Sequence, residues 1–315
     1  MRAIAVPEYG ATPVLANVPR PEPGPGQLLV KVIAAGVNTL DWRIAEGALK
    51  DSVDAAFPLV LGRDGAGVVE DVGEGVTRLR HGEQVYGCLS DVARGLGTYA
   101  EYAVVDQHGP VGRIPDRLLY SDAAAVPTAC MTALELVEAA GVTAGQAVLV
   151  AGATTGVGRA VVQLAAASGA KVVATARRAM AGEIRGLGAA ATVDPAAGVF
   201  TDQVLAAHPG GLDTVIDLVS DAAGAEALVR LLRPGGAYAG TTWAVNPDAM
   251  AARRIRGVNL DGTPTAALLE RVSALVDSGG LRVAVEREVP LHAAPGALAD
   301  DRAGPARHGA TVIRI

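Results

Sequence analysis

The second part of the chain alternates short apolar runs with longer segments whose apolar residues recur at helical spacing. Residues 147–151 form a continuous apolar run typical of a buried strand, and residues 158–168 have the spacing of an amphipathic helix. Further strands are expected at 171–175, 214–218, 237–240 and 257–260, and helices at 123–140, 179–187 and 222–232. This alternation predicts βαβ units and a doubly wound parallel sheet that is covered on both faces.

The first part of the chain reads differently, as short strands separated by turns. Strands are expected at 27–32, 65–73 and 99–105, and the proline-rich stretch 19–26 is expected to be an extended loop. After residue 263 a helix at 265–278 precedes strands at 283–289 and 310–315. We therefore expect an α/β protein with a mostly-β domain (1–118 and 264–315) and a parallel-sheet domain (119–263), and a cleft between them for a ligand.

Composition narrows the possible functions. Of the 315 residues 50% are hydrophobic and 19% charged, which is ample for a large core, and the net charge is −6. With no cluster of basic residues, a nucleic-acid or anionic-membrane partner is not expected. Two cysteines, Cys88 and Cys130, can form neither a disulfide framework nor a four-thiolate zinc site. Together with the lack of a long uninterrupted apolar stretch, this predicts a cytoplasmic protein.

A glycine-rich turn follows the strand at 147–151 and leads into a helix. Small residues let the backbone approach an anion, and the unpaired N–H groups of a helix N-terminus can bind phosphate oxygens. The preceding strand, the following helix and a second strand about 20 residues on favour a dinucleotide pyrophosphate site. The alternative is a close-packed turn without a ligand. The expected binding residues are Gly152, Ala153, Thr154, Thr155, Gly156 and Val157.

The end of the next strand indicates which dinucleotide is bound. An NAD site places an acidic residue there to accept a hydrogen bond from the ribose hydroxyl, but this chain has Arg177 and Arg178. Two guanidinium groups could bind the additional phosphate of NADPH. The alternative is that both arginines are simply solvated at the start of a surface helix. We predict NADPH as the cofactor.

Several motifs, in this order, resemble those of the medium-chain dehydrogenase/reductase superfamily, in its zinc-free quinone oxidoreductase (zeta-crystallin-like) branch. Beside the glycine turn they are Ala-Ala-Gly-Val-Asn-Thr-Leu-Asp-Trp at 34–42, Pro-Leu-Val-Leu-Gly-Arg-Asp-Gly-Ala-Gly-Val-Val at 58–69, Gly-Thr-Tyr-Ala-Glu-Tyr at 97–102 and Leu-Arg-Pro-Gly-Gly at 232–236. The resemblance covers nearly the whole chain. It implies a GroES-like β-barrel domain joined to a Rossmann domain, NADPH as cofactor, and a homodimer.

The resemblance also bears on zinc. Zinc-dependent relatives have cysteine at the position of Asn38, a His-Glu pair at Arg63-Asp64, and a third ligand near Thr128. These residues do not make a zinc ligand set, and the five histidines have no ligand spacing, so no metal is expected. Without a Lewis acid, an enone or quinone suits the site better than an alcohol, because its reduction needs only hydrogen-bond donors for the developing charge.

Roles follow for individual residues. Asn38 is expected near the nicotinamide ribose and the substrate oxygen, although it could instead satisfy the backbone of its own loop. Asp41 is expected to hold that loop, and Asp64 to be a structural carboxylate in the vacated metal position. The proton donor is not identified by the sequence, and solvent or a cofactor hydroxyl could serve.

The other expected cofactor contacts lie in the parallel-sheet half. By resemblance, Thr132 reaches the cofactor phosphate or the nicotinamide ribose, and Thr128 lies on the same helix. Strand ends of parallel sheets bind ligands at their carboxyl edge. The backbone of Asp217, Leu218 and Val219 is assigned to adenosine, and that of Gly240, Thr241 and Thr242 to nicotinamide, with Thr242 and Trp243 as possible substrate contacts.

Two alternatives stay open beside an NADPH-dependent quinone or enone reductase. The first is a tailoring reductase or cyclase of a polyketide-like pathway on the same scaffold, since tyrosines common near the site in the family are missing here. The second is a protein that binds NADPH without turnover, as a redox sensor. The chain is not a short-chain dehydrogenase. That family needs a Tyr-x-x-x-Lys motif, and none of the six tyrosines here is followed by a lysine four residues later.

Overall fold

The computed structural model describes residues 1–198, 200–302 and 309–315, which form two compact units. The first unit comprises Met1–Ala129, Pro264–Gly279 and Val283–Ile315, and the second comprises Cys130–Thr263 and Gly280–Arg282. The division after Ala129 differs from the boundary expected after residue 118. The reason is that α2 (Tyr120–Ala124) packs against two strands of the first unit, β3 (Gln27–Gly36) and β5 (Asp64–Val72).

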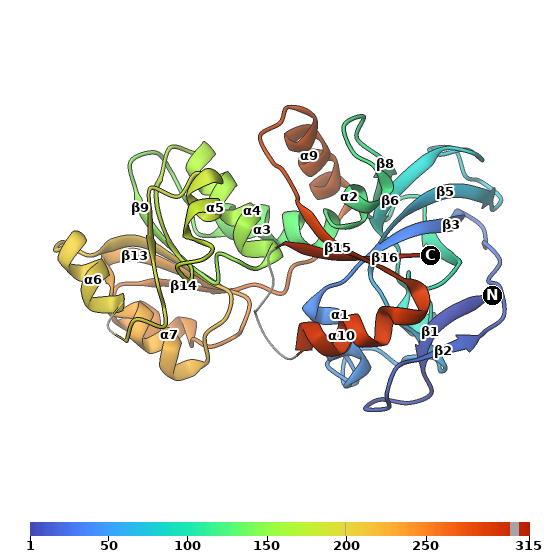
Figure 1. The fold of residues 1–315 in the computed structure, drawn as a ribbon, viewed down its shortest axis with the longest axis horizontal. Helices are drawn as coiled ribbons and strands as arrows, with labels where there is room; N and C mark the ends of the chain where they lie inside the picture. Colours follow the sequence, from blue (N-terminus) through green and yellow to red (C-terminus); the bar gives the residue numbers. More distant parts are fainter. Residues whose placement is uncertain (199, 303–308) are drawn as a thin grey trace. The chain divides into compact units, whose positions relative to one another are not determined.

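The second unit contains a six-stranded, entirely parallel sheet in the order β11-β10-β9-β12-β13-β14. Figure 1 labels three of its strands, β9, β13 and β14. Its strands are β9 (Ala147–Ala151), β10 (Lys171–Thr175), β11 (Ala191–Val193), β12 (Leu212–Asp217), β13 (Leu232–Gly240) and β14 (Arg256–Asn259). Its helices include α4 (Gly156–Ala167), α5 (Ala181–Gly186), α6 (Phe200–Ala207), α7 (Ala222–Val229) and α8 (Pro247–Ala252). The chain order of the strands reverses between β9 and β12, which is the switch point of a Rossmann fold.

The first unit is built from two mostly antiparallel sheets. The larger runs β15-β16-β3-β5-β6-β8, with β7 also paired to β3, and the smaller runs β2-β1-β4. The strands are β1 (Arg2–Val6), β2 (Val14–Asn17), β3 (Gln27–Gly36), β4 (Leu59–Val60), β5 (Asp64–Val72), β6 (Gln84–Cys88), β7 (Tyr102–Asp106), β8 (Val111–Arg113), β15 (Val285–Pro290) and β16 (Ala310–Arg314). The expected GroES-like domain plus Rossmann domain is therefore confirmed.

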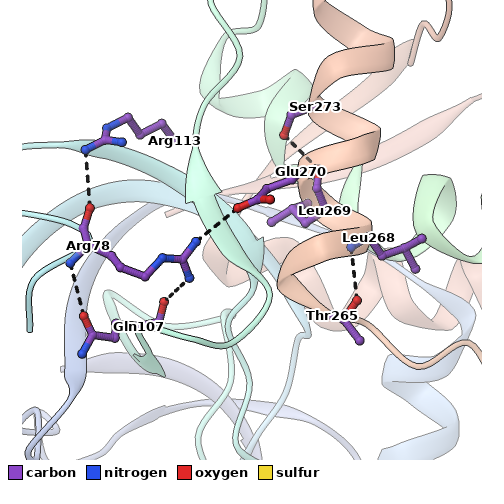
Figure 2. A network of polar contacts seen from close by, with 8 residues as sticks. All are labelled: Arg78, Gln107, Arg113, Thr265, Leu268, Leu269, Glu270 and Ser273. Carbon is purple, nitrogen blue, oxygen red and sulfur yellow. Dashed lines mark hydrogen bonds and ion pairs between the residues drawn. The ribbon is translucent and has the colours of Figure 1, made fainter.

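Helix α9 (Ala266–Asp277) is fixed to the barrel of the first unit by polar contacts (Figure 2). The guanidinium of Arg78 lies 3.4 Å from the Glu270 carboxylate and donates to the main-chain oxygen of Gln107 at 2.7 Å. The hydroxyls of Tyr86 and Ser273 are hydrogen-bonded at 2.7 Å. These contacts explain why this helix, which follows the Rossmann sheet in sequence, belongs to the first unit.

The structure corrects one expected helix and adds others. The helix expected over 123–140 is divided into α2 and α3 (Pro127–Ala139), because Pro127 opens a new helix and disfavours helical backbone at the residue before it. Helices α6, α8, α1 (Thr39–Ala45) and α10 (Ala294–Arg302) were not expected. Of these, α1 and α10 lie side by side in the first unit (Figure 1). The Trp42 indole of α1 donates to Asp301 of α10 at 3.2 Å. Within the described ranges, the helices are too short or too polar to cross a bilayer.

Candidate active site

The glycine turn in the second unit is closed by its own residues. Thr155 is the N-cap of α4: its hydroxyl accepts from the main-chain N–H of Gly158 at 3.0 Å and donates to the carbonyl of Gly152 at 2.9 Å. A Cβ on Gly158 would lie only 2.1 Å from that carbonyl oxygen, so the turn and the helix touch through backbone. The first N–H groups of the helix lack intrahelical acceptors and form a ready site for a phosphate group.

This turn lies at the switch point of the sheet. The main-chain N–H of Gly152 donates to the Thr175 hydroxyl at the end of β10, at 2.9 Å. On the other side, a Cβ on Gly152 would come within 2.7 Å of Val219 and 3.2 Å of Leu218, and its φ of +83° also favours glycine. The structure thus brings the turn next to the 218–219 loop after β12, at the edge where open α/β sheets bind ligands.

The carboxylate of Asp217 is used in hydrogen bonds within the protein. It is fully buried, accepts the Tyr238 hydroxyl at 2.6 Å, and accepts the main-chain N–H groups of Val219 and Ser220 at 3.2 and 3.1 Å. Burial, together with the hydrogen bond to Asp217, raises the pKa of Tyr238 well above its ordinary range, so its hydroxyl keeps its proton. Asp217 therefore shapes the 218–220 loop, and only its backbone remains for a ligand. No local pattern in the sequence points to Tyr238.

The residues after β13 form the neighbouring part of the edge. The main-chain N–H of Thr241 donates to the carbonyl of Asp217 at 3.3 Å, and a Cβ on Gly240 would lie 2.8 Å from the same oxygen. Thr242 is exposed. Trp243 is 59% exposed, has a φ of 56°, and donates from its indole N–H to Asp261 at 2.8 Å. A bulky residue in the left-handed region is strained, and this one lies just beyond the carboxyl end of β13.

Arg177 and Arg178 are both exposed just beyond β10. The main-chain N–H of Arg178 donates to the Asp194 carboxylate at 3.2 Å, which fixes the loop that carries both side chains. Among the described residues, neither guanidinium forms an ion pair. Both are therefore available to an external anion at the carboxyl end of the second strand of the Rossmann sheet.

Thr132 and Cys130 lie in the part of α3 that belongs to the second unit. Thr132 is 8% exposed and faces Gly262, where a Cβ would lie 2.8 Å from its hydroxyl. The neighbouring Glu135 accepts the main-chain N–H of Thr263, and burial raises its pKa. Thr132 thus packs against the segment after β14. Cys130 is fully buried, as expected for a small filler.

In the first unit, three positions far apart in sequence converge on one carboxylate. Asp64, only 1% exposed, accepts the Asn38 side-chain amide at 3.0 Å. It accepts the main-chain N–H of Thr128 at 2.9 Å, the Thr128 hydroxyl at 2.7 Å, and the Cys88 thiol at 3.2 Å. Burial raises the pKa of Asp64, and the hydrogen bonds from Thr128 and Cys88 oppose that rise. Burial also raises the pKa of Cys88, which keeps the thiol protonated.

This cluster does not fit a zinc centre. Zinc in proteins is held by three or four thiolate, imidazole or carboxylate ligands, whereas Asn38 and Thr128 are poor ligands and Asp64 already accepts four donors. In the described part of the chain, no group of three or more His, Cys, Asp or Glu residues could hold a metal ion. The residues at these positions make a hydrogen-bonded cluster instead.

A second buried carboxylate fixes the loop before α1. Asp41 is 1% exposed and accepts the main-chain N–H of Asn38 at 2.8 Å and the Tyr99 hydroxyl at 2.6 Å. Tyr99 also lies 3.2 Å from the carbonyl of Gly36. Holding this loop is the role expected for Asp41. Burial raises its pKa to about 7, although the hydrogen bonds from Tyr99 and Asn38 favour the charged form.

The raised pKa of Asp41 predicts a pH-dependent contribution to stability. Because the folded carboxyl binds its proton more tightly than the unfolded one, this contribution is complete at low pH and declines as the pH rises toward about 7. Between about pH 5 and pH 7, the free energy of unfolding should fall by about 1 kcal/mol per pH unit more in the wild type than in Asp41→Asn. Urea titrations across this range measure the difference.

The exposed Asp116→Asn is the matched control, since it removes one carboxylate without disturbing a buried site. Parallel pH profiles for the wild type and Asp41→Asn would contradict the prediction. Such parallel profiles would mean that the buried carboxyl is ionised over this whole range, as it is in the unfolded chain.

These features define a class of fold: a barrel domain and a Rossmann domain whose glycine turn can hold the phosphate of a dinucleotide. Residues 24–116 match the family described as alcohol dehydrogenase GroES-like domain, and residues 156–255 match the family described as zinc-binding dehydrogenase. The chain belongs to the medium-chain dehydrogenase/reductase superfamily, in the quinone oxidoreductase branch.

Individual relatives support this assignment. The chain is 32% identical over 300 residues to 2-methylene-furan-3-one reductase of Solanum lycopersicum, covering 92% of this chain and 73% of that protein. With the same coverage it is 30% identical to the chloroplastic NADPH-dependent alkenal/one oxidoreductase of Arabidopsis thaliana. The structure of the quinone oxidoreductase from Coxiella burnetii superposes with a TM-score of 0.89 at 26% identity, covering 100% of this chain and 99% of that one. The protein is therefore an oxidoreductase, as these relatives are, and it acts on a small molecule.

Proposed function

We propose that this protein is a zinc-independent, NADPH-dependent reductase of quinones or of carbon–carbon double bonds activated by a carbonyl group. The observation that carries the proposal is the Asp64 cluster, in which the positions of the family's zinc ligands are occupied by residues that hydrogen-bond one another. One of the matched families is described as zinc-binding, so zinc independence is proposed from this chain's own residues. Without a Lewis acid to stabilise an alkoxide, an activated acceptor is the better substrate.

The choice of NADPH rests on the end of β10. The exposed guanidinium groups of Arg177 and Arg178 stand where an NAD-binding protein would have a carboxylate. A carboxylate would repel the additional phosphate of NADPH, whereas a guanidinium can bind it bidentately. The name of the Arabidopsis thaliana relative, an NADPH-dependent oxidoreductase, agrees with this choice.

The residues then take the following roles. Thr154, Thr155, Gly156 and Val157 in the glycine turn bind the pyrophosphate, while the backbone of 217–219 binds adenosine and that of 240–242 binds nicotinamide. NADPH supplies the hydride when bound. Asn38 binds near the nicotinamide ribose and the substrate oxygen. No side chain is assigned as proton donor, because water can protonate the α-carbon of the enolate or the oxygen of the quinolate.

The decisive experiment follows NADPH consumption by the purified protein with a panel of acceptors: a benzoquinone, a small enone, an enoyl thioester and a saturated ketone. We expect saturable turnover with the quinone or the enone and none with the saturated ketone. Turnover with the thioester alone would favour a tailoring enzyme of a polyketide-like pathway. Tight NADPH binding without consumption of any acceptor would favour a redox sensor.

Metal dependence is measured on the same preparation. Activity should be unchanged after dialysis against a chelator, and elemental analysis should find zinc well below one ion per chain. Loss of activity on chelation with recovery on adding zinc would overturn zinc independence. The homodimer and the cytoplasmic location remain predictions, and the first is checked by sedimentation or light scattering.

A further inference from the structure

The proposed role of Asn38 leaves open which end of its side-chain amide faces a ligand. The two ends differ chemically, because the nitrogen donates hydrogen bonds and the oxygen accepts them. Asn38 is half-buried, and its main chain is fixed, since its N–H donates to the buried Asp41 at 2.8 Å. The residue therefore cannot move away from its neighbours, and only rotation of its side chain can change which atom faces the ligand.

The hydrogen bonds of Asp64 determine how the Asn38 side chain is rotated. Its Oδ2 receives the main-chain N–H of Thr128 at 2.9 Å, and a main-chain N–H can only donate. This oxygen is therefore an acceptor whether or not a proton is bound at Oδ1. The Asn38 Nδ2 donates to the same Oδ2 at 3.0 Å. Rotating the amide by half a turn would set its carbonyl oxygen against the carboxylate oxygen, two acceptors without a proton between them, in a place where Asp64 is 1% exposed.

The other carboxylate oxygen of Asp64 differs in this respect. Its partners are the Thr128 hydroxyl at 2.7 Å and the Cys88 thiol at 3.2 Å, and both groups can donate or accept. The Oδ1 side of the cluster therefore tolerates either a donor or an acceptor on residue 64. Only the Oδ2 side, which touches Asn38, requires an acceptor.

We propose that Asp64 is a positioning residue that holds the Asn38 amide with its nitrogen inward and its carbonyl oxygen toward the ligand. Asn38 then acts as a hydrogen-bond acceptor for a hydroxyl group of the bound cofactor or of the reduced product, rather than as the main donor to the substrate carbonyl. This inference rests on the proposed function, because it assigns the chemistry that Asn38 contributes to that site.

Two substitutions at Asp64 separate orientation from charge. In Asp64→Asn, the amide oxygen can keep the Oδ2 place and its nitrogen can donate to Thr128 Oγ1 or Cys88, so Asn38 keeps its orientation. In Asp64→Leu the shape is similar, but the acceptor is lost and the Asn38 amide is free to rotate. We expect kcat/KM to stay within about threefold of wild type in Asp64→Asn and to fall about tenfold or more in Asp64→Leu.

A double-mutant cycle with Asn38→Ala distinguishes positioning from a merely structural role. If Asp64 acts through Asn38, Asp64→Leu should cost less than about threefold in kcat/KM when Asn38 is already alanine. NADPH affinity, measured by direct titration, is followed through the same cycle, and melting temperatures are recorded for each variant. A structural role would lower stability and activity equally in both backgrounds.

The outcomes are distinct. If the wild-type protein neither binds NADPH nor reduces any acceptor, the proposed function fails. If the wild-type protein is active but the effects of Asp64→Leu and Asn38→Ala on kcat/KM and on NADPH affinity are additive, the positioning role of Asp64 is wrong while the proposed function stands. Equal losses in Asp64→Asn and Asp64→Leu would show that the charge of Asp64 matters rather than the orientation it imposes.

Discussion

Replacing Gly158 with alanine should weaken NADPH binding by roughly a hundredfold or more, the loss of about two charge-assisted hydrogen bonds. The added Cβ would lie 2.1 Å from the carbonyl oxygen of Gly152 and 2.8 Å from Cα of Ala153. Both are backbone atoms, so they cannot rotate away, and the turn must open. Opening the turn moves the N–H groups at the start of α4 away from the pyrophosphate. Titration of NADPH by fluorescence measures the effect.

Gly186→Ala is the matched control for Gly158→Ala. Gly186 ends α5, is exposed, and a Cβ there would meet no atom within 4 Å. This substitution should leave NADPH affinity unchanged and raise the free energy of unfolding by up to roughly 1 kcal/mol, since alanine is the better helix former. Wild-type affinity in a folded Gly158→Ala protein would mean that the turn does not hold the pyrophosphate.

Removing either arginine after β10 should lower the preference for NADPH over NADH by roughly tenfold to a hundredfold. The effect should come from weaker binding of NADPH, because NADH has no phosphate at that position. Comparing Arg177→Ala with Arg178→Ala shows which guanidinium binds the phosphate more strongly. Dissociation constants for both cofactors, measured at low and high salt, are the required data.

Lys171→Ala removes the same charge at the opposite end of the same strand and is the matched control. It should leave the preference between the two cofactors unchanged, because the amino end of a parallel strand does not face the ligand edge. Equal affinity for NADPH and NADH in the wild type and in both arginine variants would contradict the proposed phosphate site.

The periodicity of apolar residues predicted the central strands of the second unit, although it missed α6 and α8, and it was a weaker guide in the first unit. Strands β9, β10 and β12 are buried on both faces, so their apolar runs are continuous and easily recognised. Helix α10 begins Ala-Pro-Gly and carries two aspartates, and it is stabilised by packing on its neighbours rather than by intrinsic helix preference. The break before Pro127 could have been predicted from the proline itself, because proline favours the first turn of a new helix.

In the candidate site, too, some parts could be predicted from the sequence and others could not. The glycine turn and the two arginines are contained in short stretches of sequence, and each stretch has its own physical signal. The partners of Asp64 are 24, 26 and 64 residues away along the chain, and Tyr99 is 58 residues from Asp41. Nothing local to Asn38 indicates that its amide nitrogen faces a buried carboxylate.

The amino-acid sequence by itself determined the two-domain plan, the dinucleotide turn and the cationic end of β10, because strand periodicity, turn chemistry and side-chain charge are local properties. Only the tertiary structure decided how Asn38, Asp64, Cys88 and Thr128 share one set of hydrogen bonds, and that Asp217 is bound by Tyr238. Such contacts depend on which distant segments the packed core brings within hydrogen-bonding distance, and that is a property of the whole fold.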